Sequence, residues 1–394
     1  MASELKVNTI TEATSGSGIT FAKDVIPATP LSHRNMIING GMTVWQRGIN
    51  AVVTATGGST GYGTADRWRF EEGTGGSFTS GREALSVADQ GITGQRTALE
   101  LLVTATDTSL TGNEYAYFFQ RLEGQDLQHL QYGSSNAKTI TLSFWVKSNL
   151  TGTYCIYLRK VDNTDAYLVK EYTISAANTW EKKIITITPT EGSTTAITTS
   201  GGAIDNDTGF GLEIGWSLGF GPNYHTTKDT WQNVEDYTTA AAVNWMGASN
   251  NFYITGVQLE LGSVATPFEH RSYVDELRRC QRYFVNYGIN DAGGFAVSPE
   301  SGVSFRHTTP GASNTITSNA CFANVDLPVR MRTGSPTFTA GRAYNGSGSN
   351  LSNTNWGPFT PTGCAQQICI QKKTNDMTTN QTIIILSFSI EAEL

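Results

Sequence analysis

Aromatic side chains are the residues of this sequence best suited to recognition chemistry. Trp216, Tyr224, Trp231, Tyr237 and Trp245 fall within the single stretch 216–245. Flat aromatic rings stack on sugar rings, and Tyr and Trp are favoured anchors of protein contacts. We expect Trp216 and Trp245 in the core. Tyr224 and Trp231 lie in a polar segment and are candidate glycan- or receptor-binding residues, with packing against a neighbouring loop or subunit as the favoured alternative.

A second aromatic group lies near the end of the chain. Tyr344, Trp356 and Phe359 occur in the segment 344–364, which is rich in Gly, Ser, Asn, Thr and Pro. This composition predicts a long loop, and loops of that length are usually functional or disordered. We therefore expect these three side chains to contact a receptor or a glycan.

Residues for catalysis are not arranged in a known pattern. The sequence has no G-x-S-x-G or H-E-x-x-H motif, and its five histidines lack metal-binding spacing. Glycoside hydrolysis needs two facing carboxylates. Among 34 acidic residues, pairs such as Glu71–Glu72 or Glu260 with Glu269 cannot be singled out. The sequence therefore predicts a protein that is not an enzyme.

Two short clusters could bind a metal ion. Asp205, Asn206 and Asp207 supply oxygen ligands suited to calcium, but an Asx-rich turn is the favoured interpretation. Cys364 and Cys369 have no histidine nearby, so we expect two free thiols. No cofactor is predicted, and a structural calcium ion stays open.

Composition narrows the fold and the partners. The 394 residues are too many for one core, and 41 glycines with 15% charged residues favour strands and turns over long helices. No apolar run is long enough for a membrane span, and the first residues do not resemble a signal peptide. The net charge is −7, and no Lys/Arg run indicates nucleic-acid binding. The basic residues Arg278, Arg279 and Arg282 are expected to be solvated or ion-paired.

The elements that position the first aromatic group belong to a domain at 33–271. Most of its apolar segments alternate with polar residues and are separated by Gly-rich turns, which predicts an antiparallel sandwich of the jelly-roll type. A short helix is expected at 124–131, and the Thr/Gly-rich insert 189–209 is expected to be a mobile surface loop. The expected strands are 36–47, 64–72, 77–87, 97–104, 115–122, 138–147, 153–160, 166–174, 181–188, 210–218 and 251–261.

The segment 250–284 is expected to join this domain to a second one. Its strand slips at Thr255-Gly256, which suggests a bulge. Ser272 can cap a connector helix at 272–280. On that helix Val274, Leu277 and Cys280 share one face. The resemblance described below places that face near a three-fold axis.

The two ends of the chain have different predicted roles. Residues 1–32 bury too little apolar surface to fold alone, so we expect them to intertwine with other copies. The residues making these contacts would be Leu5, Val7, Ile10, Ile19 and Phe21. A disordered tail is the alternative, and the resemblance described below favours the intertwined arm. The segment 281–394 is expected to form a smaller β-sandwich. Its strands are expected at 281–287, 294–297, 302–306, 314–325, 336–340, 365–371 and 382–392, the last in a central position.

Several of these stretches also resemble a known group of proteins. They are MASELKVNTITEATSGSGITF, NMIINGGMTVWQRG, YFFQRLEGQDLQHL with TITLSFWVKS, ITGVQLELGSVATPFEHRSYVDELRRCQRYF and the terminal SFSIEAEL. They resemble bacteriophage tail-fibre and related virion surface proteins. The resemblance implies a jelly roll similar to carbohydrate-binding modules, a homotrimer, and an N-terminal arm that docks on other tail or capsid proteins.

Taken with the residues, the resemblance predicts a homotrimeric tail fibre or spike in the virion, assembled in the host bacterial cytoplasm. Its partner would be a glycan or protein on the host cell surface. Two alternatives stay open, namely a structural capsid fibre, decoration or tail adaptor protein, and a glycan-degrading tailspike.

Overall fold

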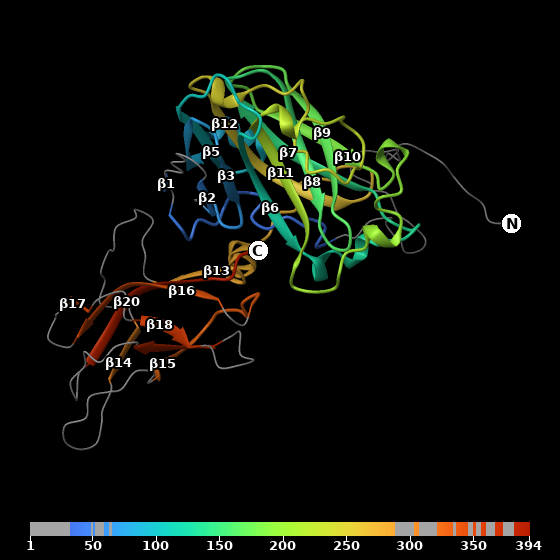
Figure 1. Cartoon of the computed structure of the whole chain (residues 1–394). Helices are drawn as coiled ribbons and strands as arrows, with labels where there is room; N and C mark the ends of the chain where they lie inside the picture. The colour runs from blue at the N-terminus through green and yellow to red at the C-terminus, as the bar shows by residue number, and fades with distance from the viewer. Residues whose placement is uncertain are drawn as a thin grey trace, which may run out of the picture.

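The computed structural model confirms an all-β chain with antiparallel sheets (Figure 1). Among the residues that the structure describes, two sheets of six strands form the first part, and sheets of five and three strands form the C-terminal part. The described residues are 32–48, 50–51, 59–62, 65–287, 303–306, 321–333, 336–345, 350–351, 356–359, 367–372 and 382–394. The expected arm contacts and the strand expected at 294–297 lie outside them.

The chain crosses repeatedly between the first two sheets, as in a jelly roll. One sheet has the order β1 (Asn50–Ala51), β4 (Ser77–Ala84), β5 (Thr97–Ala105), β12 (Asn251–Leu261), β7 (Ile140–Ser148) and β10 (Glu181–Ile187). The other has the order β2 (Ser59–Tyr62), β3 (Arg69–Glu72), β6 (Tyr115–Glu123), β11 (Phe210–Phe220), β8 (Gly152–Lys160) and β9 (Ala166–Ile174).

Large aromatic side chains from both sheets fill the space between them. Trp216 of β11 stacks on Phe118 of β6, with ring centroids 5.3 Å apart. Across the core it meets Phe144 of β7 edge-on at 5.4 Å, and Phe118 meets Phe252 of β12 at 5.9 Å. These contacts make the two sheets the layers of one sandwich. Trp216 and Trp245 are fully buried, as predicted.

The expected strand at 36–47 is not formed. Asn39 and Met42 have φ angles of 59° and 52°, which a strand cannot accommodate. The side-chain oxygen of Asn39 accepts hydrogen bonds from the backbone N–H groups of Thr43 and Val44, at 2.8 and 3.0 Å. The side-chain hydrogen bonds of Asn39 therefore stabilise a local turn in place of the strand that the apolar pattern predicts. Nearby, an unexpected helix α1 (Val87–Thr93) follows Ser86, whose hydroxyl accepts from the N–H of Asp89.

The insert 189–209 is anchored to the sandwich, so its prediction as a mobile surface loop was wrong. It contains two short 3₁₀ helices, η2 (Glu191–Ser193) and η3 (Ser200–Gly202). Ile197 and Ile204, its two isoleucines, lie in the main core. The helix expected at 124–131 is present as the 3₁₀ helix η1 (Gly124–Leu130), with Leu127 and Leu130 buried.

The connector has the predicted form. The pairing of β12 with β7 shifts between Thr255 and Gln258, and Gly256 has a φ of 61°, as a bulge requires. Helix α2 (Tyr273–Gln281) begins after Ser272, whose hydroxyl accepts from the N–H of Asp275 at 3.2 Å. In the described part of the chain, no helix is long and apolar enough to cross a membrane.

The C-terminal part is organised around its last strand. β20 (Thr382–Glu391) pairs with β13 (Phe284–Tyr287), β14 (Val303–Arg306) and β16 (Thr337–Asn345), so its predicted central position is confirmed. β17 (Asn350–Leu351) adds to β16. A separate sheet has the order β15 (Cys321–Asp326), β19 (Gln367–Lys372) and β18 (Trp356–Phe359).

Candidate functional site

The outer face of the second sheet carries an aromatic cluster. Tyr117 and Phe119 of β6 point away from the core and stack at 5.4 Å. Tyr237, from the loop 221–244, stacks on Tyr117 at 5.5 Å and meets Tyr157 of β8 at 4.7 Å. All four rings are buried. The loop therefore closes this aromatic face against its own chain, and no sugar ring can stack there without displacing it.

The hydroxyl groups of these tyrosines also have hydrogen-bond acceptors within the chain. The hydroxyl of Tyr157 donates to Glu213 at 2.8 Å, and that of Tyr117 donates to Glu71 at 2.6 Å. Gly215 lies opposite Tyr157, and a Cβ there would come within 2.3 Å of the Tyr157 ring. Burial raises the pKa of Tyr157 well above its usual value, and the Glu213 carboxylate adds to the rise. The face is a packed layer and not an open platform.

Trp231 is only 2% exposed and lies in the main core, so it is not an exposed stacking residue. Its indole N–H donates to the backbone carbonyl of Thr188 at 2.9 Å, and its backbone N–H donates to the backbone carbonyl of Glu191. The favoured alternative, packing against the insert, is the one observed. Tyr224 ends the 3₁₀ helix η4 (Pro222–Tyr224), is half-buried, and meets Tyr115 edge-on at 6.3 Å.

The second aromatic group does not share one loop. Tyr344 belongs to β16 and pairs with Ile384, whereas Trp356 and Phe359 bound β18, which pairs with β19 in the other sheet. The prediction of one continuous loop at 344–364 was therefore wrong. Strand pairing competes with a loop when segments of low hydrophobicity lie beside strong strands such as β20.

Helix α2 packs on the first domain through the side chains that we expected at a three-fold axis. Cys280 is fully buried with Ile38, Val44 and Tyr283, and Leu277 packs against the same cluster. Burial raises the pKa of the Cys280 thiol well above its usual value, and the Asp66 carboxylate adds to the rise. Cys280 is therefore used in a contact within the chain, which corrects its expected role, whereas Leu277 is only partly buried and its contact at a three-fold axis stays a prediction. Val274 faces outward and is 55% exposed.

Charged residues fix α2 to the sandwich as well. The buried carboxylate of Glu276 accepts from the backbone N–H of Asn39, and Arg271 reaches it at 3.3 Å. At the other end of the helix, Arg282 donates two hydrogen bonds of 2.7 Å to the Glu123 carboxylate. Burial opposes ionisation of Glu123, but the bonds from Arg282 and Tyr283 bring its pKa below the usual value. The connector is thus held rigidly by paired charges.

The C-terminal residues return to this junction, where Figure 1 shows the C-terminus between the two parts of the chain. Glu393 accepts from the fully buried Arg67 and, at 3.1 Å, from Arg47. The guanidinium of Arg67 also lies 3.4 Å from the ring centre of Tyr283. The first domain and the C-terminal segment therefore share one buried ionic network.

Asp66 lies beside this network and makes the stability of the junction depend on pH. Burial raises its pKa from 3.8 to about 6, against the opposing effects of Arg47 and Gln46. A raised folded-state pKa contributes stability below pH 3.8 that is lost as the pH rises through about 6. The shift corresponds to about 3 kcal/mol.

We expect Asp66→Asn to abolish this loss. Relative to the natural protein, the variant should gain about 2.4 kcal/mol in unfolding free energy between pH 4 and pH 7.5, because the unfolded carboxyl is already partly ionised at pH 4. Urea unfolding of both proteins at the two pH values measures the difference. An equal difference at both values would contradict the role assigned to Asp66.

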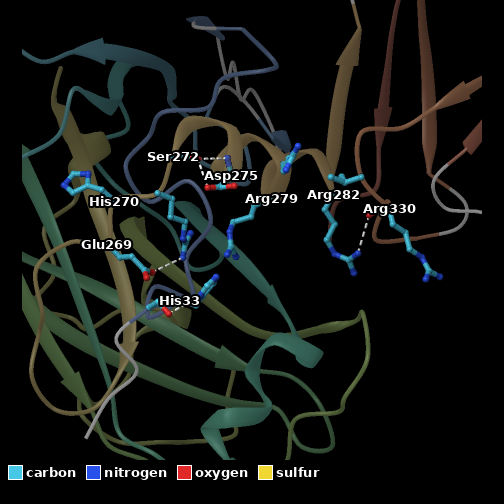
Figure 2. A pocket seen from close by; sticks show the side chains of 12 residues that line it. His33, Glu269, His270, Ser272, Asp275, Arg279, Arg282 and Arg330 are labelled. Atoms are coloured by element: carbon cyan, nitrogen blue, oxygen red, sulfur yellow. Dashed lines mark hydrogen bonds and ion pairs between the residues drawn. The ribbon is translucent and has the colours of Figure 1, made fainter. Parts of the chain in front are cut away.

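An open cleft lies beside α2, and its side chains are shown in Figure 2. Its volume is about 740 Å³, within the range of roughly 300–1,000 Å³ that ligand pockets occupy. Figure 2 shows Arg279 projecting into it, between Glu269 on one side and Arg282 on the other. The lining residues are Ser32, His33, Glu269, His270, Arg271, Ser272, Asp275, Arg278, Arg279, Arg282, Val329 and Arg330. Hydrogen-bond donors dominate this surface, which suits polar ligands.

The oxygen-rich segment 205–207 forms turns. One carboxylate oxygen of Asp207 accepts from the N–H of Gly209 at 2.8 Å, which is an Asx turn. The N–H of Asp205 donates to Asp162 at 3.0 Å. Among the residues that the structure describes, no group of three His, Cys, Asp or Glu side chains could hold a metal ion.

No protein-family profile and no curated protein matches the chain. Solved structures that match include the enzymatically active domain of tailspike protein 4 from bacteriophage CBA120. That match has 13% identity and a TM-score of 0.26, and it covers 50% of this chain and 19% of the tailspike chain. The family 11 carbohydrate-binding module from Clostridium thermocellum matches at 12% identity and a TM-score of 0.26, covering 55% of this chain and 100% of the module.

A third match is the module TmCBM61 in complex with β-1,4-galactotriose, at 11% identity and a TM-score of 0.26. It covers 58% of this chain and 99% of the module. Likeness at this level carries over neither fold nor activity. The description of the fold rests on the strand pairing and the core given above.

Proposed function

We propose that this chain is a non-enzymatic phage virion protein, a homotrimeric tail fibre or spike that recognises a glycan on the host cell surface. The observation that carries the proposal is the junction. The segment 250–284, which carries the junction motif of the resemblance to virion fibres, folds as β12, α2 and the start of β13 and fixes the two parts of the chain to one another. The polar cleft beside α2 opens on this rigid unit.

Exposed apolar side chains on α2 support self-association. Tyr273 is 58% exposed and Val274 is 55% exposed, both in the first turn of the helix. Contact between three copies would cover them and would let the arm residues intertwine. Three weak glycan sites on one rigid particle then give tight adsorption, because the second and third contacts form at high effective concentration.

The proposal is tested with purified protein and the surface polysaccharide of the bacterium on which the encoding phage grows. We expect sedimentation of a trimer, retention of the polysaccharide, and no new reducing ends. New reducing ends would favour the glycan-degrading tailspike instead. A trimer that retains no polysaccharide, and that antibodies locate on the capsid of phage particles, would favour the structural alternative.

A further inference from the structure

The cleft beside α2 concentrates positive charge in an acidic protein. Its lining includes five arginines, which we call the cleft arginines: Arg271, Arg278, Arg279, Arg282 and Arg330. Only two carboxylates, Glu269 and Asp275, line the same cleft, whereas the whole chain has a net charge of −7. A local excess of guanidinium groups raises the electrostatic free energy of the fold unless negatively charged partners offset their mutual repulsion.

Two of the cleft arginines already have partners and serve the fold. Arg271 donates to the backbone carbonyls of Asn35 and Ile37 and pairs with Glu276. Arg282 donates to Glu123 through Nε and Nη2, and its Nη1 donates to the backbone carbonyl of Arg330 at 3.4 Å. These side chains shape the walls of the cleft and have little capacity left for a ligand.

The other three have spare hydrogen-bonding capacity. Within the described part of the chain, the side chains of Arg278, Arg279 and Arg330 have no hydrogen-bonded or ion-paired partner, and Arg278 and Arg330 are exposed. The C-terminal end of a helix favours cations, which explains Arg278 and Arg279 in the last turn of α2. It does not explain Arg330, which comes from the segment after β15 and faces the same cleft.

We propose that this cleft binds the anionic group of an acidic saccharide, with Arg279 and Arg330 as the binding residues. The guanidinium fork matches the oxygens of a carboxylate or a phosphate ester and bonds to them in pairs. The imidazoles of His33 and His270 lie in the same lining and add hydrogen-bonding groups for sugar hydroxyls. This inference rests on the proposed glycan recognition and specifies the class of glycan.

The test compares three probes on the full-length protein by titration calorimetry: trigalacturonate, mannose 6-phosphate and neutral galactotriose. We expect an acidic probe to bind at least about tenfold more tightly than galactotriose, and added salt to weaken it. The double variant R279Q/R330Q should remove that preference with only a small change in the thermal midpoint, because neither side chain has a hydrogen-bonded or ion-paired partner in the described part of the chain. The control R82Q/R96Q removes two exposed positive charges elsewhere and should keep the preference.

Each outcome decides the inference. Tight binding of trigalacturonate assigns a carboxylate sugar, and tight binding of mannose 6-phosphate alone assigns a phosphorylated one. Equal binding of acidic and neutral probes, or a preference that survives R279Q/R330Q, overturns the inference while leaving glycan recognition intact. No binding of these three probes, together with failure to retain host polysaccharide, overturns glycan recognition as well.

Discussion

Replacing Glu393 by alanine is expected to lower the free energy of unfolding by about 3–5 kcal/mol, the cost of leaving buried charges without a partner. The Arg67 side chain is 0% exposed, and it has Glu393, itself 5% exposed, as its ion-pair partner. Arg47, 9% exposed, depends on the same carboxylate. Alanine therefore leaves the buried Arg67 guanidinium without its ion-pair partner and leaves Arg47 with Glu391 alone. The C-terminal strands should also come loose from the sandwich, because this network connects them.

Glu391→Ala is the matched control for that change. Glu391 ends β20, two residues before Glu393, and also pairs with Arg47, but at 3.4 Å and with 43% of its side chain exposed. An exposed pair of this kind contributes at most about 1 kcal/mol. Urea unfolding of both variants, with limited proteolysis between β20 and the sandwich, separates the two cases. Equal small losses would show that the buried network does not hold the C-terminal segment.

Much of the sandwich follows from alternation alone. On β7, Ile140, Leu142, Phe144 and Val146 recur at every second position, and all four are in the core. The helix cap at Ser272 and the bulge at Gly256 were also readable, because each depends on a few adjacent residues. The turn at Asn39 was not, because its side-chain hydrogen bonds outweigh an apolar pattern that looks like a strand.

The candidate site was largely hidden from the sequence. Arg278, Arg279 and Arg282 stand out as a basic cluster, and the expectation of an ion pair holds for Arg282. Arg330 lies 48 residues further along the chain from Arg282, and no periodicity links the two. The long-range fold alone brings them to one cleft. The burial of aromatic rings such as Tyr237 is hard to predict for a similar reason, because the composition of a polar loop such as 221–244 does not indicate that the loop covers a sheet.

The difference between a buried and an exposed aromatic side chain can be measured at Trp231. We expect Trp231→Ala to lower the free energy of unfolding by about 3–5 kcal/mol, because a buried indole leaves a cavity. The variant also loses the hydrogen bond to Thr188, next to the insert that contains Ile197. Faster hydrogen exchange should therefore appear in 189–209, beyond the general loss of stability.

Tyr224→Ala provides the comparison, since Tyr224 is half-buried at the edge of the same loop. Its smaller loss of contacts should cost less than Trp231→Ala, on the order of 1 kcal/mol. An exposed stacking residue would give the opposite pattern, with stability unchanged and only glycan binding reduced. If Trp231→Ala unfolds at the same urea concentration as the natural protein, the indole does not hold the insert and its assignment to the core fails. If the insert alone exchanges faster, Trp231 is the residue through which a segment of low hydrophobicity is tied to the sandwich.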